Sequence, residues 1–171
     1  MGETQAGGAM ITLRLPVPPS ANRFWRTYMP KGFKAPVTTL SAEAKAYKTE
    51  VAWLAKAAGI RTPIIGRVSV SFIYYPKRPQ DWQKRARLDP QGWDDGVMAL
   101  DLDNLGKGLF DALKNVVFED DKFVHEIHAR RAEPDGDARV IVTITPIIMA
   151  PTHLSLFPVS DARLAITEKP F

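Results

Sequence analysis

Hydrophobic and polar residues alternate in four segments of the chain, and this period of two predicts β-strands. The predicted strands are Ile11 to Leu15, Arg67 to Tyr75, Phe123 to Arg131 and Arg139 to Thr145. The last two are separated by the turn sequence Pro134-Asp135-Gly136, in which proline presets φ and glycine tolerates a positive φ. We therefore expect these two strands to form an antiparallel hairpin.

Two further segments place hydrophobic residues at the spacing of an α-helix. The first begins at Ser41, a favourable N-cap residue, and ends at Gly59. The second runs from about Asn104 to Asn115 and carries one apolar stripe. The intervening stretches, Ser20 to Thr39 and residues 76 to 100, show no sustained period, so we expect a polar loop and a long basic loop there.

The order strand, helix, strand, helix, strand, strand predicts an α/β domain, with helices packed on a single-layer mixed β-sheet. A length of 171 residues fits one globular domain. We expect a disordered N-terminus over residues 1–9, the folded domain over residues 10–146 and an extended C-terminal extension over residues 147–171.

Composition narrows the classes of protein to consider. The chain has no cysteine, which excludes disulfide scaffolds, thiolate nucleophiles and zinc sites built on sulfur. Hydrophobic residues make up 45% and charged residues 25%, proportions typical of globular proteins. The sequence has neither an apolar run long enough for a membrane span nor the start of a signal peptide. We expect a cytoplasmic protein without membrane contact.

Charge is distributed unevenly along the chain. Residues 1–100 hold 15 basic and 7 acidic side chains, a net +8, whereas residues 101–171 hold 8 and 12, a net −4, which together give +4. Six carboxylates and only two lysines lie between Asp101 and Asp121. This acidic segment is either a solvated surface or a divalent-cation site on a protein whose remaining surface attracts a polyanion.

The positions of these carboxylates suggest a site. Asp101 and Asp103 stand two residues apart where the chain enters the second helix, and Lys107 follows one helical turn after Asp103. Asp120 and Asp121 precede the third strand, and the short connection before them permits one of them to return beside the start of the helix. Three carboxylates and an ammonium group in one pocket would suit metal-dependent hydrolysis of a phosphodiester.

A structural role would explain part of the same pattern. Asp103 directly precedes the apolar stripe, so it could simply be the helix N-cap. Lys107 could form a surface ion pair with Asp103 or Asp111. Asp101 is not explained by capping.

The segment at residues 101–113 reads DLDNLGKGLFDAL and is followed by Asp120-Asp121. It resembles the signature of the RusA family of phage-type Holliday-junction resolvases, which are crossover junction endodeoxyribonucleases. The stretches LPVPPSANR at residues 15–23 and SAEAKAY at residues 41–47 are similar to that family too. The resemblance covers about residues 11–145, with two departures: a longer stretch before Asp101, rich in aspartate and tryptophan, and a longer C-terminal tail.

The resemblance implies a RusA-like nuclease domain over residues 10–146 and a set of catalytic residues. These are Asp101, Asp103, Lys107 and Asp121, with the three aspartates as metal ligands and Asp120 as a further candidate ligand. It also implies a homodimer that uses Mg²⁺, for which Mn²⁺ can substitute.

We therefore expect a Mg²⁺-dependent endodeoxyribonuclease that resolves Holliday junctions by paired symmetric nicks, in DNA recombination and repair. Its partner would be branched DNA, chiefly four-way junctions. The expected DNA contacts are Asn22, Arg23, Arg26, Lys77, Arg78, Lys84, Arg85 and Arg87. Trp82 or Phe24 would stack on bases or act as a wedge. The alternatives are a nuclease for flaps, forks or other branched DNA without four-way preference, and a non-catalytic DNA-binding module.

Overall fold

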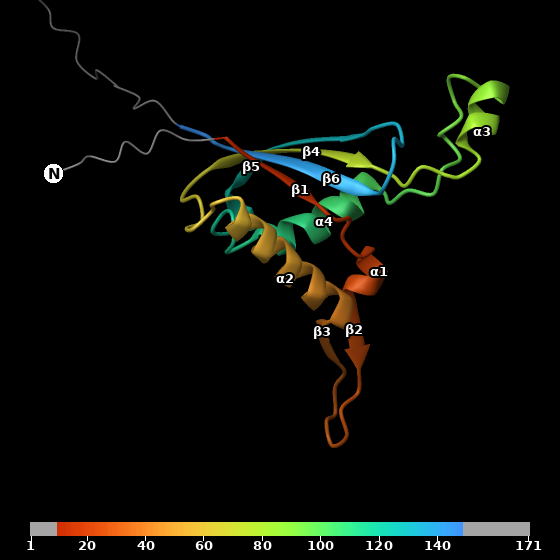
Figure 1. Ribbon diagram of the computed structural model, residues 1–171. Coiled ribbons are helices and arrows are strands. Elements are labelled where there is room, and N and C mark those ends of the chain that lie inside the picture. The colour runs from red at the N-terminus through yellow and green to blue at the C-terminus, as the bar shows by residue number, and fades with distance from the viewer. Residues whose placement is uncertain (1–9, 149–171) are drawn as a thin grey trace, which may run out of the picture.

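A computed structural model describes residues 10–148 of the chain. Within them a four-stranded mixed sheet has helices packed on one face, as Figure 1 shows. The expected α/β class, with a mixed sheet and packed helices, is confirmed. The N-terminus expected to be disordered, and all but the first two residues of the expected C-terminal extension, lie outside the described residues.

The sheet consists of β1, β4, β5 and β6 in the order β1-β6-β4-β5. These strands span Ile11–Leu15, Val68–Tyr75, Val124–Arg131 and Arg139–Pro146. Strand β6 pairs antiparallel with both β1 and β4, whereas β5 pairs parallel with β4. The predicted hairpin between the last two strands is therefore wrong, because they lie on opposite sides of β4.

Side-chain polarity explains this arrangement. Strand β6 buries Val140, Val142 and Ile144 and suits a position between two neighbours. Strand β5 reads VHEIHARR and is largely exposed, which suits the edge of a sheet. The chain reaches β5 through a helix on one face of the sheet, and such a crossover makes β5 parallel to β4.

Two long helices, α2 (Ala42–Ala57) and α4 (Leu102–Leu113), cover one face of the sheet and contact each other. Helix α2 begins as predicted, because the Ser41 Oγ accepts a hydrogen bond from the Ala44 backbone N–H at 3.1 Å. Helix α4 begins two residues earlier than predicted. Its Gly108 allows close packing, since a Cβ there would lie 3.0 Å from the Pro18 Cβ.

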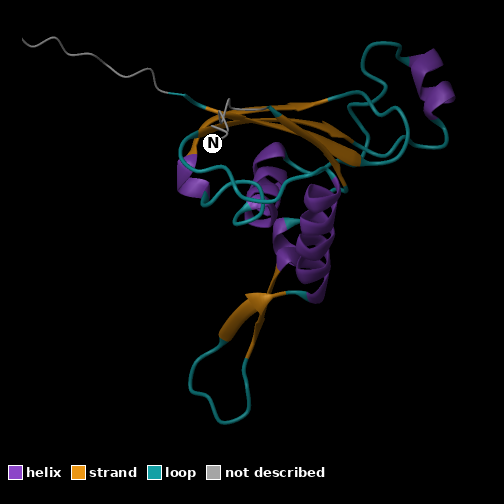
Figure 2. Cartoon of the chain, turned by 60° about the vertical axis from the view of Figure 1, so that its left-hand side comes forward, coloured by secondary structure: helices purple, strands orange, loops and turns teal. Residues whose placement is uncertain are grey.

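Both predicted loops contain regular structure. Residues 20–39 hold the short helix α1 (Ala21–Phe24) and strand β2 (Trp25–Tyr28), which pairs antiparallel with β3 (Val37–Leu40). We call residues 25–40 the ribbon, and Figure 2 shows that it projects from the body of the molecule. Residues 76–100, which we call the arm, hold helix α3 (Trp82–Leu88). Helices of four and seven residues make two turns at most and four-residue strands only two periods, so these elements leave no recognisable pattern.

The arm is fixed to the connection between β5 and β6. The Arg78 guanidinium lies 4.6 Å from the centre of the Trp82 ring, and its Nε donates a hydrogen bond to the Pro134 carbonyl at 3.0 Å. The Trp93 indole packs on Trp82 and donates to the Glu133 carboxylate at 3.1 Å. These contacts make the base of the arm a folded part of the domain.

Tyr47 lies on the buried face of α2, and its hydroxyl has no hydrogen-bond partner among residues 10–148. Burial, followed by the charge of Glu50, raises the pKa of this hydroxyl. An unsatisfied buried polar group costs free energy, so Tyr47→Phe should raise the free energy of unfolding by about 1 kcal/mol, measured by urea denaturation. A less stable Phe variant would show that the hydroxyl has a partner.

Candidate active site at the start of helix α4

Two of the predicted carboxylates lie at the start of α4. Asp101 is the N-cap residue and Asp103 lies in the first helical turn, so the alternative interpretation of Asp103 as the N-cap is wrong. The Asp101 side chain accepts no capping hydrogen bond from the helix backbone. Its Oδ2 accepts a long hydrogen bond, 3.4 Å, from the Asn104 side chain. The Asp101 carboxylate is therefore not tied to the helix backbone and is accessible to a ligand.

Lys107 lies beside this pair of carboxylates. Its Nζ is 3.8 Å from the Asp103 Oδ2, and both side chains are more than 70% exposed. A pair this exposed contributes roughly 0.3–0.5 kcal/mol to stability, so replacing Lys107 should cost little folding free energy. The structure thus brings Asp101, Asp103 and Lys107 together.

The later aspartates lie elsewhere. Asp121 begins a single turn of 3-10 helix, η1 (Asp121–Phe123), directly before β5. Lys114, the C-cap of α4, contacts the carboxylates of Asp120 at 2.9 Å and Asp121 at 3.3 Å. The Lys114 ammonium, helped by the Lys122 backbone N–H, lowers the pKa of Asp120, and the two carboxylates raise the pKa of Lys114. Asp121 is therefore engaged at the end of α4.

Two measures show that this end is far from Asp101. Helix α4 has 12 residues and is about 18 Å long. Strand β4 gives the second measure. Near its end, the Tyr74 hydroxyl accepts a hydrogen bond from the Leu100 backbone N–H at 3.4 Å, just before Asp101. At its start, Val68 pairs with Val124, just after η1, and Val68 is about 20 Å from Tyr74 along the strand. The expected return of the later aspartates to the start of the helix therefore does not occur within one chain.

The two carboxylates at the start of α4 could supply part of a metal site. Mg²⁺ prefers oxygen ligands and is usually held by one or two protein carboxylates together with substrate phosphates. Asp101 and Asp103 supply two such carboxylates. Within residues 10–148, no group of three or more His, Asp or Glu side chains is arranged to hold a metal ion. The two carboxylates fit Mg²⁺ chemistry, but a third protein ligand would have to come from a part of the protein other than the start of α4.

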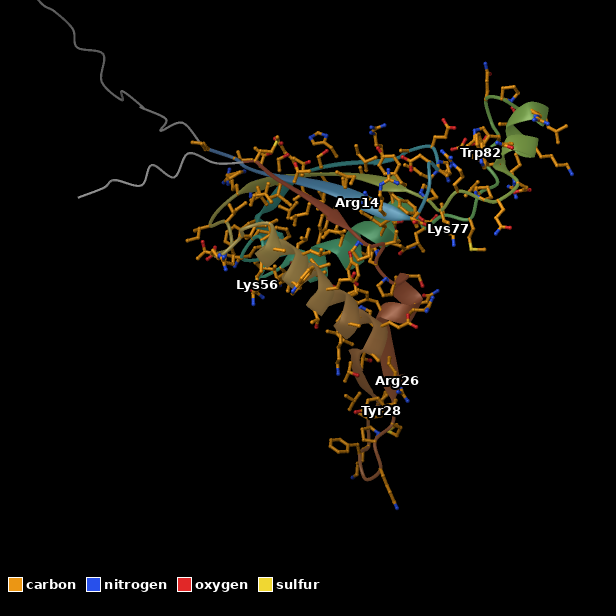
Figure 3. All side chains as sticks on the ribbon, viewed as in Figure 1. Arg14, Arg26, Tyr28, Lys56, Lys77 and Trp82 are labelled. Atoms are coloured by element: carbon orange, nitrogen blue, oxygen red, sulfur yellow. The ribbon has the colours of Figure 1, made fainter. Side chains whose placement is uncertain are left out.

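The ribbon and the arm leave the sheet at the same end as Asp101. Leu15, after which α1 and the ribbon follow, pairs with Val140, and Val140 pairs with Tyr74 just before the arm. The arm leads back to Asp101. Of the predicted DNA contacts, Asn22 and Arg23 lie in α1, Arg26 lies in β2 and the other five lie in the arm. The ribbon is purely basic, whereas the arm carries five basic and four acidic side chains. Figure 3 shows both projections, with Arg26 on the ribbon and Lys77 at the base of the arm.

Some of these basic residues are held by the protein itself. Arg23 pairs with Glu43 at 2.6 Å and Arg85 pairs with Asp81 at 3.0 Å. Arg78 stacks on Trp82, as described above. Three arm residues form no ion pair within residues 10–148 and remain available for phosphate: Lys77, Lys84 and Arg87.

Of the two predicted wedge residues, Phe24 is not presented to DNA, whereas Trp82 is half-buried on the arm. Phe24 is only 2% exposed and packs near Gly108 of α4. Trp82 is flanked by Arg78 and Trp93. Phe33 at the tip of the ribbon is instead 65% exposed. The turn sequence Pro-Lys-Gly before Phe33 was the available signal, since it predicts a tight turn that presents the next side chain.

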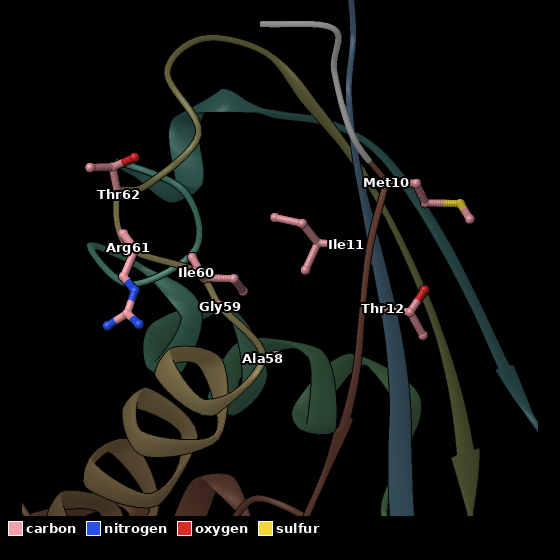
Figure 4. Close-up of a pocket in the computed structure, with 8 residues that line it drawn as sticks. All are labelled: Met10, Ile11, Thr12, Ala58, Gly59, Ile60, Arg61 and Thr62. Carbon is pink, nitrogen blue, oxygen red and sulfur yellow. The ribbon is translucent and has the colours of Figure 1, made fainter. Parts of the chain in front are cut away.

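A hollow elsewhere on the surface is unrelated to this site. It lies between the start of β1 and the loop after α2, and is lined by Met10, Ile11, Thr12 and residues 58–62 (Figure 4). Of the described residues that line it, Arg61 alone is charged, and none carries a carboxylate. These residues therefore offer no carboxylate ligands for a metal ion.

A mixed α/β domain with exposed carboxylates at the start of a helix, beside projections that carry unpaired basic side chains, has the features of a nuclease that cuts DNA internally. The model of the endodeoxyribonuclease RusA family matches residues 16–145, most of the chain. The chain belongs to this family, whose members are metal-dependent nucleases of branched DNA. A comparison with curated proteins gave no significant match. Within residues 10–148, every helix is too short or too polar to cross a membrane.

Proposed function

We propose that this protein is a Mg²⁺-dependent endonuclease that resolves four-way DNA junctions by two symmetric nicks, in recombination and repair. One observation carries the proposal. Asp101 and Asp103 are exposed and lack strong internal partners beside Lys107, in a chain of the RusA endodeoxyribonuclease family. Cutting of four-way, flap and linear DNA with and without Mg²⁺ tests it.

Asp101, Asp103 and Asp121 would hold Mg²⁺, and Asp120 is a further candidate ligand. A bound Mg²⁺ would activate water and neutralise charge at the scissile phosphate. The N-terminus of α4 orients the first two carboxylates toward solvent, where a DNA backbone can reach them. Lys107 would place its ammonium group against the phosphate oxygens as negative charge develops on them. Mn²⁺ would serve in place of Mg²⁺, because it also prefers oxygen ligands.

The distance between Asp101 and Asp121 gives the proposed homodimer a specific role. A two-fold dimer can bring the Asp121 end of one subunit to the Asp101 end of the other. Each dimer would then contain two complete sites, each with carboxylates from both subunits. Two sites related by a two-fold axis suit the paired nicks that a four-way junction requires.

The exposed edge of β5 is the surface we propose for this dimer. The edge of β5 away from β4 pairs with no other strand of residues 10–148. Antiparallel pairing of two copies centred on His128 would place Glu126 of each copy opposite Arg130 of the other, two favourable charge pairs. It would also cover Ile127, which is 54% exposed, and direct the start of each β5 toward the end of the other.

The arm supplies a prediction about DNA binding. Replacing Lys77, Lys84 and Arg87 together by alanine should weaken binding to four-way and linear DNA alike, because phosphate contacts position the protein without selecting a sequence. The slope of log affinity against log salt should fall by roughly 0.9 for each duplex phosphate that the variant no longer binds. Binding titrations over a salt series measure this slope.

Lys56→Ala is the matched control, since it removes an exposed lysine from the last turn of α2, away from the arm. It should leave the slope unchanged. If the triple variant also keeps the wild-type slope, the arm does not contact DNA, and the DNA path must use α1, the ribbon and the other subunit.

A further inference from the structure

The ribbon carries basic and aromatic side chains and no acidic one. The sequence from Met10 to Ala42 contains no Asp or Glu. The basic residues of the ribbon are Arg26, Lys31 and Lys34, and its exposed aromatic residues are Trp25, Tyr28 and Phe33. Basic groups that bind phosphates, interleaved with aromatic rings on which bases stack, are typical of surfaces that bind unpaired nucleic acid.

A tight turn holds Phe33 at the tip. The Phe33 backbone N–H donates a hydrogen bond to the Pro30 carbonyl at 3.1 Å, and Gly32 has a φ of 88°. In this four-residue turn the third residue has a positive φ, which glycine adopts without steric cost. The phenyl ring is therefore presented at a fixed point of the chain. Lys31 and Lys34 lie on either side of it and form no ion pair within residues 10–148.

The ribbon is connected to the helix that carries the candidate site. It begins directly after α1, and Phe24 of α1 packs near Gly108 of α4. Figures 2 and 3 show the ribbon extending away from the sheet and the helices, with Arg26 and Tyr28 along it. A bound DNA could thus contact the ribbon tip and the start of α4 at the same time.

We propose that the ribbon opens the branch point of the DNA, with Phe33 stacked on an unpaired base and Lys31 and Lys34 on the flanking phosphates. This inference rests on the proposed function, since it requires a branched substrate. In an intact duplex each base is stacked and paired, so exposing one is costly. At a branch point stacking is already interrupted, and the ring can replace a missing neighbour.

The test measures DNA binding in EDTA, so that no strand is cut. A four-way junction and a linear duplex of matched sequence are titrated, with 2-aminopurine at the branch point as a reporter of base unstacking. Phe33→Ala should weaken junction binding about 5- to 150-fold, the range that corresponds to losing one stacked base. Binding to linear duplex should change less than about twofold, and most of the 2-aminopurine signal should disappear. Phe33→Trp should retain both junction affinity and signal.

Ile65→Ala is the matched control. It removes another exposed apolar side chain, from the loop after α2, about 24 Å along that helix from the ribbon. It should bind both DNA molecules as the wild type does.

Three results for the Phe33→Ala variant would overturn the inference. Its junction affinity could equal that of the wild type, it could lose affinity equally for both DNA molecules, or its dimer could dissociate in size-exclusion chromatography. The last would mean that the ribbon contacts a second copy of the chain. Failure of the proposed function is a separate result, because a wild type that binds the junction in EDTA but cuts no DNA with Mg²⁺ would refute the nuclease proposal alone.

Discussion

Asp101→Asn should abolish junction cleavage while the protein stays folded and bound to DNA. We expect the cleavage rate in Mg²⁺ to fall by more than about 100-fold, since even the outer partners of metal ligands usually contribute 10- to 100-fold. Junction affinity in EDTA should equal or exceed that of the wild type, because a negative charge next to the phosphates has been removed. Single-turnover cleavage and binding titrations measure the two quantities.

Stability is the control for this substitution. Asn is as good an N-cap residue as Asp, and Asp101 makes no capping hydrogen bond that the substitution could remove. The free energy of unfolding should therefore change by less than about 0.5 kcal/mol. Normal Mg²⁺-dependent cutting by the folded variant would remove Asp101 from the site.

Mixed dimers should recover activity that each parent variant lacks. Asp101→Asn and Asp121→Asn should both be inactive as homodimers. A dimer with one subunit of each kind contains one site in which Asp101 and Asp103 come from the Asp121→Asn subunit and Asp121 comes from the other. That site is intact, so the mixed dimer should nick one strand at about half the wild-type rate.

The two subunits can be co-expressed with different affinity tags and the mixed dimer purified through both. A mixed dimer of Asp101→Asn with Asp103→Asn is the control, because both sites then lack a carboxylate at the start of α4, and it should remain inactive. If the first mixed dimer is inactive as well, each site is built within one subunit and the composite site is wrong.

The main elements of the fold could be predicted from local patterns. Ser41 caps α2, and the apolar stripe that includes Leu105 and Leu109 is buried under the sheet as α4. Strand pairing could not be predicted from the turn alone, because the Pro-Asp-Gly turn after β5 is compatible either with a hairpin or with a connection that passes over β4. The decisive signal was the polarity of VHEIHARR, which marks an edge strand.

Only the part of the candidate site that lies on one helix could be predicted from the sequence. Asp101, Asp103 and Lys107 are close in sequence, and a single helix fixes their relation. The position of Asp121 depends on where the chain goes after α4, and sequence spacing does not contain that information. Phe24 shows the same limit, since only the packing of α1 on α4 buries its ring. The exposure of Phe33, by contrast, was indicated by the turn sequence before it.

Cleavage of a matched set of DNA molecules tests the central claim most directly. The purified protein is incubated with four-way, flap and linear DNA of the same sequence, each with Mg²⁺ and with EDTA. We predict paired symmetric nicks in the four-way junction, only with Mg²⁺, and little cutting of the linear duplex. Equal cutting of flap and four-way DNA would contradict junction selectivity. Binding without metal-dependent cutting of any of these molecules would contradict the assignment of this chain as a junction-resolving nuclease.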